Sequence, residues 1–152
     1  MLEAWRMVKE RHVVTAFSGE GAARTGGRWN SRGVAVVYTS ATRSLAALET
    51  LVHLNPPVMF SYRIVRIEFD EGRVERLPLA VLPSDWQMEP PPPSTQQLGD
   101  TWARSSRSAI LAVPSVIIPD ETNYLLNPVH PDFRNISFGK PEPFTFDPRL
   151  LA

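Results

Sequence analysis

The stretch that decides the fold runs from Val34 to Leu54 and reads VAVVYTSATRSLAALETLVHL. Its first part, Val34–Thr39, is an apolar run rich in valine and bounded by Gly33 and Ser40, which predicts a buried strand. Ser40 is then a candidate N-cap for a helix that runs from Ala41 to about Leu54. The stretch therefore predicts a strand that passes directly into an amphipathic helix.

Outward from this stretch, the sequence predicts short strands, turns and one further helix. The segment Asn55–Pro57 ends the first helix, and a second short helix is expected over Thr95–Arg104. The glycine-rich segment Phe17–Arg32 is interpreted as a loop, and Asn123–Phe146 as short strands and turns. Further strands are expected at Leu2–Val8, Met59–Phe69, Val74–Leu77, Ala109–Val113 and Ser115–Ile118.

Composition limits the class of protein. The chain has 152 residues, 43% of them hydrophobic, which suits one domain with one core. The 15 prolines disfavour long helices, so we expect an α+β fold over residues 1–152, with a proline-rich internal loop at about 83–93. Because basic and acidic residues number 16 each, direct nucleic-acid binding is not expected. No cysteine, membrane-length apolar run or signal peptide is present, which predicts a cytoplasmic protein without thiol chemistry.

Glu49 stands out within the predicted helix. Leu45, Leu48 and Val52 define its buried stripe, and Glu49 falls about 40° from Leu45 at about 100° per residue. Carboxylates are rarely left beside a core without a partner or a role. Spacing alone also allows a glutamate that leans to solvent or pairs with an arginine.

Three further positions are candidates for ligand binding. Arg28 ends a glycine-rich run, where backbone amides and a forked guanidinium can hold phosphate, although an ordinary turn fits as well. Tyr38, at the end of the valine-rich strand, can stack on a flat ring or belong to the core. Ser115 lies between two apolar runs and needs a hydrogen-bond partner.

The three histidines predict no metal site. His53 lies one helical turn after Glu49, and this single pair is too small a ligand set for a metal. A triad of Ser115, His130 and Asp132 is disfavoured, because no Gly-x-Ser-x-Gly elbow surrounds the serine.

Taken together, several blocks of this sequence resemble the RES-domain family. The similarity extends from about Trp5 to Phe138, and five blocks in the family's order make it specific. The blocks are Ala16–Gly21 with Gly26–Ser31, Val36–Ser40 with Leu45–Glu49, Gln97–Trp102, Val113–Ser115, and Asn123–Pro128 with His130–Phe133.

The resemblance implies a fold like that of ADP-ribosyltransferases and a toxin of a bacterial toxin–antitoxin pair. It implies that NAD is a substrate rather than a cofactor, and that its nicotinamide–ribose bond is cleaved with water or inorganic phosphate as the acceptor. It also implies a partner antitoxin with an Xre-like helix-turn-helix domain and a homodimer within the complex. Protein ADP-ribosylation and a catalytically inactive nucleotide-binding module are the alternatives.

The resemblance also assigns roles to residues. The family's catalytic arginine, tyrosine, glutamate and serine correspond to Arg28, Tyr38, Glu49 and Ser115. On this basis Glu49 would stabilise positive charge on the ribose, and Tyr38 would stack on nicotinamide or the ribose. Ser115 would hydrogen-bond the nicotinamide amide or orient Glu49. The NAD-binding positions expected from the resemblance are Gly27, Arg28, Tyr38, Ser115 and Asn127.

Overall fold

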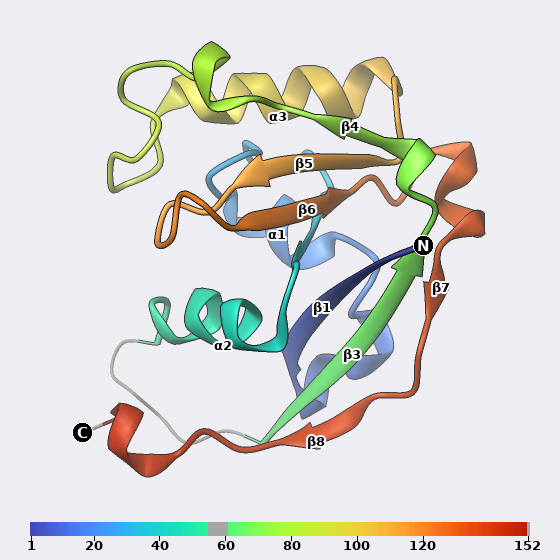
Figure 1. Ribbon diagram of the computed structural model, residues 1–152, viewed down its shortest axis with the longest axis vertical. Coiled ribbons are helices and arrows are strands. Elements are labelled where there is room, and N and C mark those ends of the chain that lie inside the picture. Colours follow the sequence, from blue (N-terminus) through green and yellow to red (C-terminus); the bar gives the residue numbers. More distant parts are fainter. Residues whose placement is uncertain (55–60, 152) are drawn as a thin grey trace.

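In the computed structural model, which describes residues 1–54 and 61–151, the valine-rich segment forms the central strand β2 (Val37–Ser40) of one curled sheet (Figure 1). The sheet has eight strands in the order β4-β5-β6-β2-β1-β3-β7, and β8 pairs with β3 outside this path. The other strands are β1 (Leu2–Lys9), β3 (Tyr62–Phe69), β4 (Val74–Arg76), β5 (Ile110–Pro114), β6 (Thr122–Leu126), β7 (Ser137–Phe138) and β8 (Glu142–Phe144).

Strand pairing places β2 between β1 and β6. Strand β2 pairs along its whole length with β6, from Val37 opposite Leu126 to Ser40 opposite Asn123, but meets β1 only where Ser40 lies opposite Trp5. All neighbouring strands are antiparallel except β4 and β5, which are parallel. The sheet therefore opens between β1 and the rest of β2, next to the glycine-rich segment.

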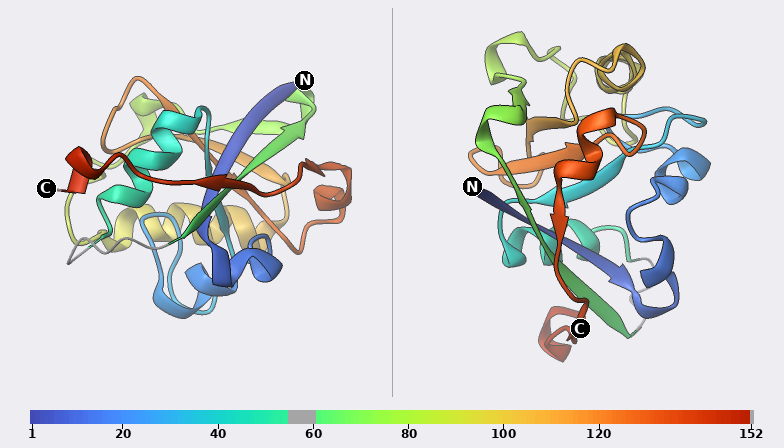
Figure 2. Two further views of the ribbon diagram at one scale, coloured as in Figure 1. Left: turned by 90° about the horizontal axis from the view of Figure 1, so that it is seen from below. Right: turned by 90° about the vertical axis from the view of Figure 1, so that its right-hand side faces the viewer.

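The described part of the chain has three α-helices: α1 (Glu20–Thr25), α2 (Arg43–Leu51) and α3 (Pro93–Ser105). Helix α3 lies against β4 and β5 at one end of the molecule, and α2 lies beside β1 and β2 (Figures 1 and 2). Short 3₁₀ helices occur at Glu10–Thr15, Glu71–Arg73, Leu79–Val81, Pro131–Asn135 and Pro148–Leu151. The expected α+β class is confirmed.

The core forms three apolar clusters around the sheet. Two of them contain the largest fully buried side chains, with Phe69 and Ile67 in one and Trp102 in the other. The third cluster joins Trp5 of β1 to Ala46 of α2 and fixes the helix against the strand. Helix α2 is therefore held where its edge can face the opening of the sheet.

Several element boundaries differ from the sequence-based prediction. The segment Phe17–Arg32 is not only a loop, because α1 forms between Gly19 and Gly26, which both adopt positive φ angles. Ser40 still belongs to β2, and the N-cap of α2 is Thr42, whose hydroxyl accepts from the Leu45 amide at 3.1 Å. The sequence-based prediction placed the cap at Ser40 because the pairing that extends β2 beyond Thr39 involves a distant strand and leaves no mark in the local sequence.

Two other predictions are corrected. Ser115–Ile118 is a bend rather than a strand, because the Ser115 hydroxyl accepts from the amides of Ile117 and Ile118, both at 3.1 Å. Helix α3 begins at Pro93, the last residue of the predicted proline-rich loop, and not at Thr95, since proline is favourable in the first turn of a helix. The predicted helix stop at Asn55–Pro57 and the start of the strand at Met59 lie outside the described residues.

Two negative findings apply to residues 1–54 and 61–151. Within these ranges no helix is long and apolar enough to cross a membrane. The same described residues contain no group of three or more histidine or acidic side chains arranged to hold a metal ion.

Candidate functional site

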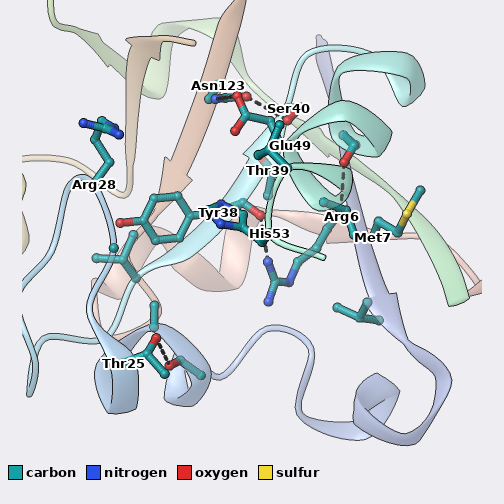
Figure 3. A pocket seen from close by; sticks show the side chains of 18 of the residues that line it. Arg6, Met7, Thr25, Arg28, Tyr38, Thr39, Ser40, Glu49, His53 and Asn123 are labelled. Carbon is teal, nitrogen blue, oxygen red and sulfur yellow. Dashed lines mark hydrogen bonds between the residues drawn. The ribbon is translucent and has the colours of Figure 1, made fainter. Parts of the chain in front are cut away.

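A cavity of about 1040 Å³ opens where β1 and β2 separate (Figure 3). This volume is at the upper end of the ~300–1,000 Å³ typical of small-molecule pockets. Its walls come from β1, β2, α1, α2 and the proline-rich loop, which for the structure we define as residues 83–92. Of the predicted site residues, four line the cavity: Gly27, Arg28, Tyr38 and Glu49.

Glu49 is held on the cavity wall by two side chains from distant parts of the sequence. Its Oε1 accepts hydrogen bonds from the Ser115 hydroxyl at 2.8 Å and from the Asn123 amide at 2.9 Å. Both donors reach the same oxygen, and among the described residues no donor reaches Oε2. The carboxylate is therefore fixed in orientation and keeps one oxygen available to a ligand.

Ser115 supports Glu49 and does not itself line the cavity. The serine is fully buried, and its oxygen also accepts from the two amides of the bend. Asn123, which was not predicted as a site residue, lines the cavity and accepts from the Ser40 hydroxyl at 2.7 Å through Oδ1. Its pairing opposite Ser40 becomes visible only once strand register is known.

Tyr38 presents its ring to the cavity while its hydroxyl is tied to the glycine-rich segment. The hydroxyl accepts from the Trp29 amide at 3.0 Å and donates to Asn30 Oδ1 at 2.5 Å. Burial raises the pKa of Tyr38 above its ordinary value of 10.0, so the phenol stays neutral at physiological pH. A Cβ at Gly27 would lie 2.7 Å from this hydroxyl, which explains why glycine occupies that position.

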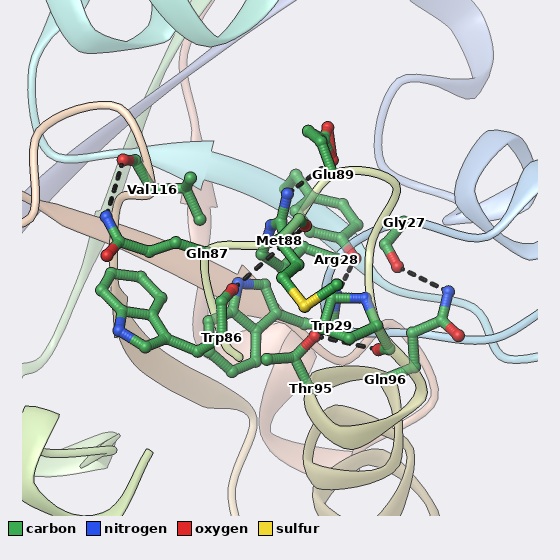
Figure 4. A network of polar contacts seen from close by, with 12 residues as sticks. Gly27, Arg28, Trp29, Trp86, Gln87, Met88, Glu89, Thr95, Gln96 and Val116 are labelled. Carbon is green, nitrogen blue, oxygen red and sulfur yellow. Dashed lines mark hydrogen bonds and ion pairs between the residues drawn. The ribbon is translucent and has the colours of Figure 1, made fainter. Parts of the chain in front are cut away.

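Arg28 contacts the proline-rich loop (Figure 4). Its Nη1 donates to the carbonyls of Trp86 at 3.1 Å and Met88 at 2.6 Å, and its Nη2 pairs with Glu89 at 2.6 Å. The Arg28 side chain is only 12% exposed, whereas that of Glu89 is 62% exposed. The arginine therefore clamps the loop against the cavity, and Glu89 occupies part of its anion-binding fork.

Arg6 of β1 also lines the cavity, although no pattern in the sequence marks it as a site residue. Its Nε donates to the Ala16 carbonyl at 2.6 Å and its Nη1 to the Tyr38 carbonyl at 2.8 Å. Burial lowers the pKa of Arg6 from its ordinary value to about 10, so the guanidinium is still charged at neutral pH. Alternation along a strand predicts only which face such a residue occupies.

Asn127 does not reach the cavity. It is fully buried behind α3, where its amide donates to the Ala103 carbonyl at 3.0 Å and its Oδ1 accepts from the Val129 amide at 3.2 Å. These contacts stabilise the turn after β6, and the NAD-binding role expected for Asn127 stays a prediction. The disfavoured triad is absent too, since His130 bonds the Ser106 carbonyl while Ser115 bonds Glu49.

Residues 3–147 match the sequence model of the RES domain. The chain belongs to the RES domain family. This confirms the resemblance seen in the sequence, and the match includes every residue placed on the cavity wall.

Curated relatives carry toxin names. The Prs ADP-ribosylating toxin of Sphingobium sp. (strain YBL2) is 42% identical over 153 residues, which cover 97% of this chain and 95% of that protein. Toxin Res of Yersinia enterocolitica (serotype O:8 / biotype 1B) is 38% identical over 148 residues, which cover 96% of this chain and 97% of that protein.

A solved structure shares the fold. The match is to a chain of the MbcT–MbcA toxin–antitoxin complex of M. tuberculosis, with a TM-score of 0.73. It covers 95% of this chain and 84% of that chain at 15% identity, so it shows the fold alone.

Proposed function

We propose that this RES-domain protein is the toxin of a bacterial toxin–antitoxin pair and degrades NAD by cleaving the bond between nicotinamide and ribose. The observation that carries the proposal is the Glu49 carboxylate, fixed on a large cavity by Ser115 and Asn123 with one oxygen unengaged. The toxin names of relatives support the biological role. The ADP-ribosylating name supports NAD as the substrate, because ADP-ribosylation consumes NAD.

In the proposed reaction the bond between ribose C1′ and the nicotinamide nitrogen breaks, and nicotinamide leaves with the electron pair. Positive charge builds on the ribose, as in glycoside hydrolysis. Glu49 stabilises that charge and accepts hydrogen bonds from the ribose hydroxyls, at little reorganisation cost because its orientation is already fixed. An oxygen of water or inorganic phosphate then bonds to C1′, and water gives up its proton to solvent.

The other residues would bind and orient NAD. The Tyr38 ring would stack on nicotinamide or the ribose, and Ser115 would act through Glu49 without touching the substrate. Arg28, with the backbone amides near Gly27, would hold the pyrophosphate once Glu89 releases its Nη2. NAD is consumed as a substrate, so the proposal requires no resident cofactor or metal.

Protein ADP-ribosylation is the second candidate, and the name of the Sphingobium relative favours it specifically. The two activities share every step up to departure of nicotinamide and differ only in the acceptor. A protein side chain would replace water or phosphate at C1′. Cavity geometry around Glu49 serves both reactions equally, so identification of the product decides between them.

The deciding experiment incubates purified protein with NAD, with and without inorganic phosphate and with added cell protein, and identifies products by mass. ADP-ribose, a phosphorylated ADP-ribose or a modified protein would each name the acceptor. Glu49→Gln should lower the rate by about 100- to 1000-fold, the usual cost of one transition-state partner. The control is Glu71→Gln, an exposed glutamate remote from the cavity.

Two outcomes would count against this proposal. Near-normal turnover by folded Glu49→Gln protein would remove the role given to Glu49. Wild-type protein that binds NAD without releasing nicotinamide under any of the three conditions would instead indicate an inactive nucleotide-binding module.

A further inference from the structure

Hydrolysis of NAD releases one proton that phosphorolysis does not. When a water oxygen bonds to ribose C1′, that oxygen must lose a proton, whereas the attacking oxygen of a phosphate dianion carries none. In the proposed reaction Glu49 is occupied, because Ser115 and Asn123 hold one carboxylate oxygen and the ribose hydroxyls take the other. A second base on the cavity wall would therefore speed attack by water and not attack by phosphate.

In the described part of the chain, five side chains that line the cavity can accept a proton near neutral pH. They are His12, Glu20, Glu49, His53 and Glu89. Glu89 is paired with Arg28, and His12 accepts a hydrogen bond from Arg11 at 3.3 Å. Glu20 lies on α1, and neither donor that holds Glu49 comes from this helix. His53 is the remaining candidate.

His53 lies one helical turn after Glu49. Helix α2 ends at Leu51, and a further turn follows in which the His53 amide donates to the Thr50 carbonyl at 3.2 Å. Residues four apart in a helical segment lie on the same face, one above the other. Both side chains line the cavity, and Figure 3 draws both among the residues of its wall. The carboxylate and the imidazole can therefore contact one ligand.

The imidazole of His53 is unengaged. The residue is exposed, and among residues 1–54 and 61–151 no group forms a hydrogen bond or ion pair with its ring nitrogens. By contrast, both ring nitrogens of His130 are held, one by the Ser106 carbonyl and the other by the Asp132 amide. The His53 ring is free to take a proton from a molecule in the cavity and to pass it to solvent.

We propose that His53 is a catalytic residue of the hydrolytic reaction, where it accepts a proton of the attacking water and thereby sets how well water competes with phosphate as the acceptor. As the water oxygen bonds to C1′ and nicotinamide leaves with the electron pair of the broken bond, one ring nitrogen takes the proton. The imidazolium then gives that proton to solvent. With phosphate the attacking oxygen is already anionic, so His53 has no proton to take. This inference rests on the proposed function for the substrate and for the bond that breaks.

His53→Gln tests the proposal through the rates of formation of two products. Purified protein is incubated with NAD, with and without inorganic phosphate, and ADP-ribose and phosphorylated ADP-ribose are measured by mass. We expect kcat for ADP-ribose formation to fall about 10- to 100-fold, below the usual contribution of a general base because the ribose cation is a strong electrophile. Formation of phosphorylated ADP-ribose and the KM for NAD should stay within about twofold of wild type.

Two further variants sharpen the test. His12→Gln is the matched control, because it removes another exposed histidine that lines the cavity from a different element, and it should change neither product. His53→Ala leaves space beside the ligand, so added imidazole should restore ADP-ribose formation by this variant without affecting the phosphorylated product. Because both histidines are exposed, all three variants are expected to fold.

Three outcomes would overturn the proposal: equal losses of both products in His53→Gln, no loss of either, or wild-type protein that releases nicotinamide only when phosphate or protein is the acceptor. Each of these outcomes leaves cleavage of NAD intact. Failure of the proposed function is a different result, because wild-type protein would then release no nicotinamide, and both proposals would fall.

Discussion

At the residue scale, the site depends on side chains with two tasks. Tyr38 offers its ring to the cavity, while its hydroxyl fixes the Trp29 amide and Asn30 in the glycine-rich segment. Asn30 in turn donates to the carbonyls of Ala22 and Val34, which ties α1 to the segment that leads into β2. One phenol therefore couples the ligand surface to the shape of the glycine-rich segment.

Tyr38→Phe should separate these tasks. Losing the hydroxyl leaves Asn30 and the Trp29 amide short of a partner, so the free energy of unfolding should fall by about 1–3 kcal/mol. Because the ring remains, the KM for NAD should change little, whereas Tyr38→Ala should raise it strongly. Denaturant unfolding and steady-state kinetics check this. A Tyr38→Phe protein with a KM as high as that of Tyr38→Ala would contradict stacking.

Comparison of wild type with Tyr38→Phe also tests how stability depends on pH. The pKa of Tyr38 is raised by burial, so above pH 10 the unfolded state loses this proton while the folded state keeps it. The folded state binds more protons, and stability must fall as pH rises. The stability difference between wild type and Tyr38→Phe should therefore shrink by about 1.4 kcal/mol per pH unit above 10. If the stability difference between the two proteins does not change with pH, the pKa of Tyr38 is not raised by burial.

At this scale, the sequence could predict features that arise within one element, but not contacts between residues far apart in the chain. Glu49 was detectable because the helical repeat predicted it beside a buried stripe within one element. The structure corrects that stripe, because α2 buries Leu45 and Ala46 and leaves Val52 exposed. Its partners Ser115 and Asn123 come from the bend after β5 and from β6, and nothing local links them to α2. The position of Arg6 on the cavity could not be predicted for a similar reason. Arg6 faces a cavity only because β1 and β2 separate, and this separation is a feature of the folded sheet.

At the scale of elements, the proline-rich loop behaves as a clamped wall. Arg28 holds it through two carbonyls and Glu89, and Gln87 reaches the Val116 carbonyl at 3.5 Å on the bend that also contains Ser115 (Figure 4). The loop therefore connects the arginine side of the cavity with the glutamate side. Its composition predicted a proline-rich loop but could not indicate these contacts.

Glu89→Gln should change substrate binding through this loop. Glutamine removes the negative charge and weakens the contact with Nη2 of Arg28, while the two carbonyl contacts keep the loop in place. If Arg28 holds the pyrophosphate of NAD, the KM should fall about two- to tenfold with little change in kcat. Glu71→Gln is the matched control. An unchanged or raised KM would instead make Arg28 a loop clamp only.

Helix α3 owes its position to a glycine. A Cβ at Gly99 would lie 1.6 Å from the Trp29 carbonyl oxygen, so only glycine lets the helix approach the segment that carries Arg28. The next residue, Asp100, accepts from the Ser31 amide at 2.9 Å and from the Ser31 hydroxyl. The Gln97–Trp102 block, quoted for the family resemblance, thus anchors the wall of the site.

Gly99→Ala should be among the most damaging single substitutions. The clash is with backbone, which cannot rotate away, so the cost should exceed the usual ~1–3 kcal/mol of overpacking. Chemical denaturation compared with Gly21→Ala, where an added Cβ meets nothing within 4 Å, provides the measurement. Equal stability of the two variants would show that α3 can move away from Trp29.

At the scale of the whole molecule, the question is how such a cavity is restrained. An enzyme that drains NAD harms its own cell unless a partner blocks it. Zero net charge suits a protein that leaves DNA binding to a partner. We therefore propose an antitoxin with an Xre-like helix-turn-helix domain that covers the cavity, with a homodimer of this chain in the complex.

Co-expression with a neighbouring helix-turn-helix gene tests this arrangement. Expression alone should lower cellular NAD and arrest growth, whereas co-expression should restore both and yield a co-purifying complex with little NAD-degrading activity. Stripping the partner away should return the activity, because the Glu49 site is already formed in the isolated chain. Light scattering of the complex measures the number of copies. High-level expression of the chain alone without loss of cellular NAD would overturn the toxin proposal while leaving the fold intact.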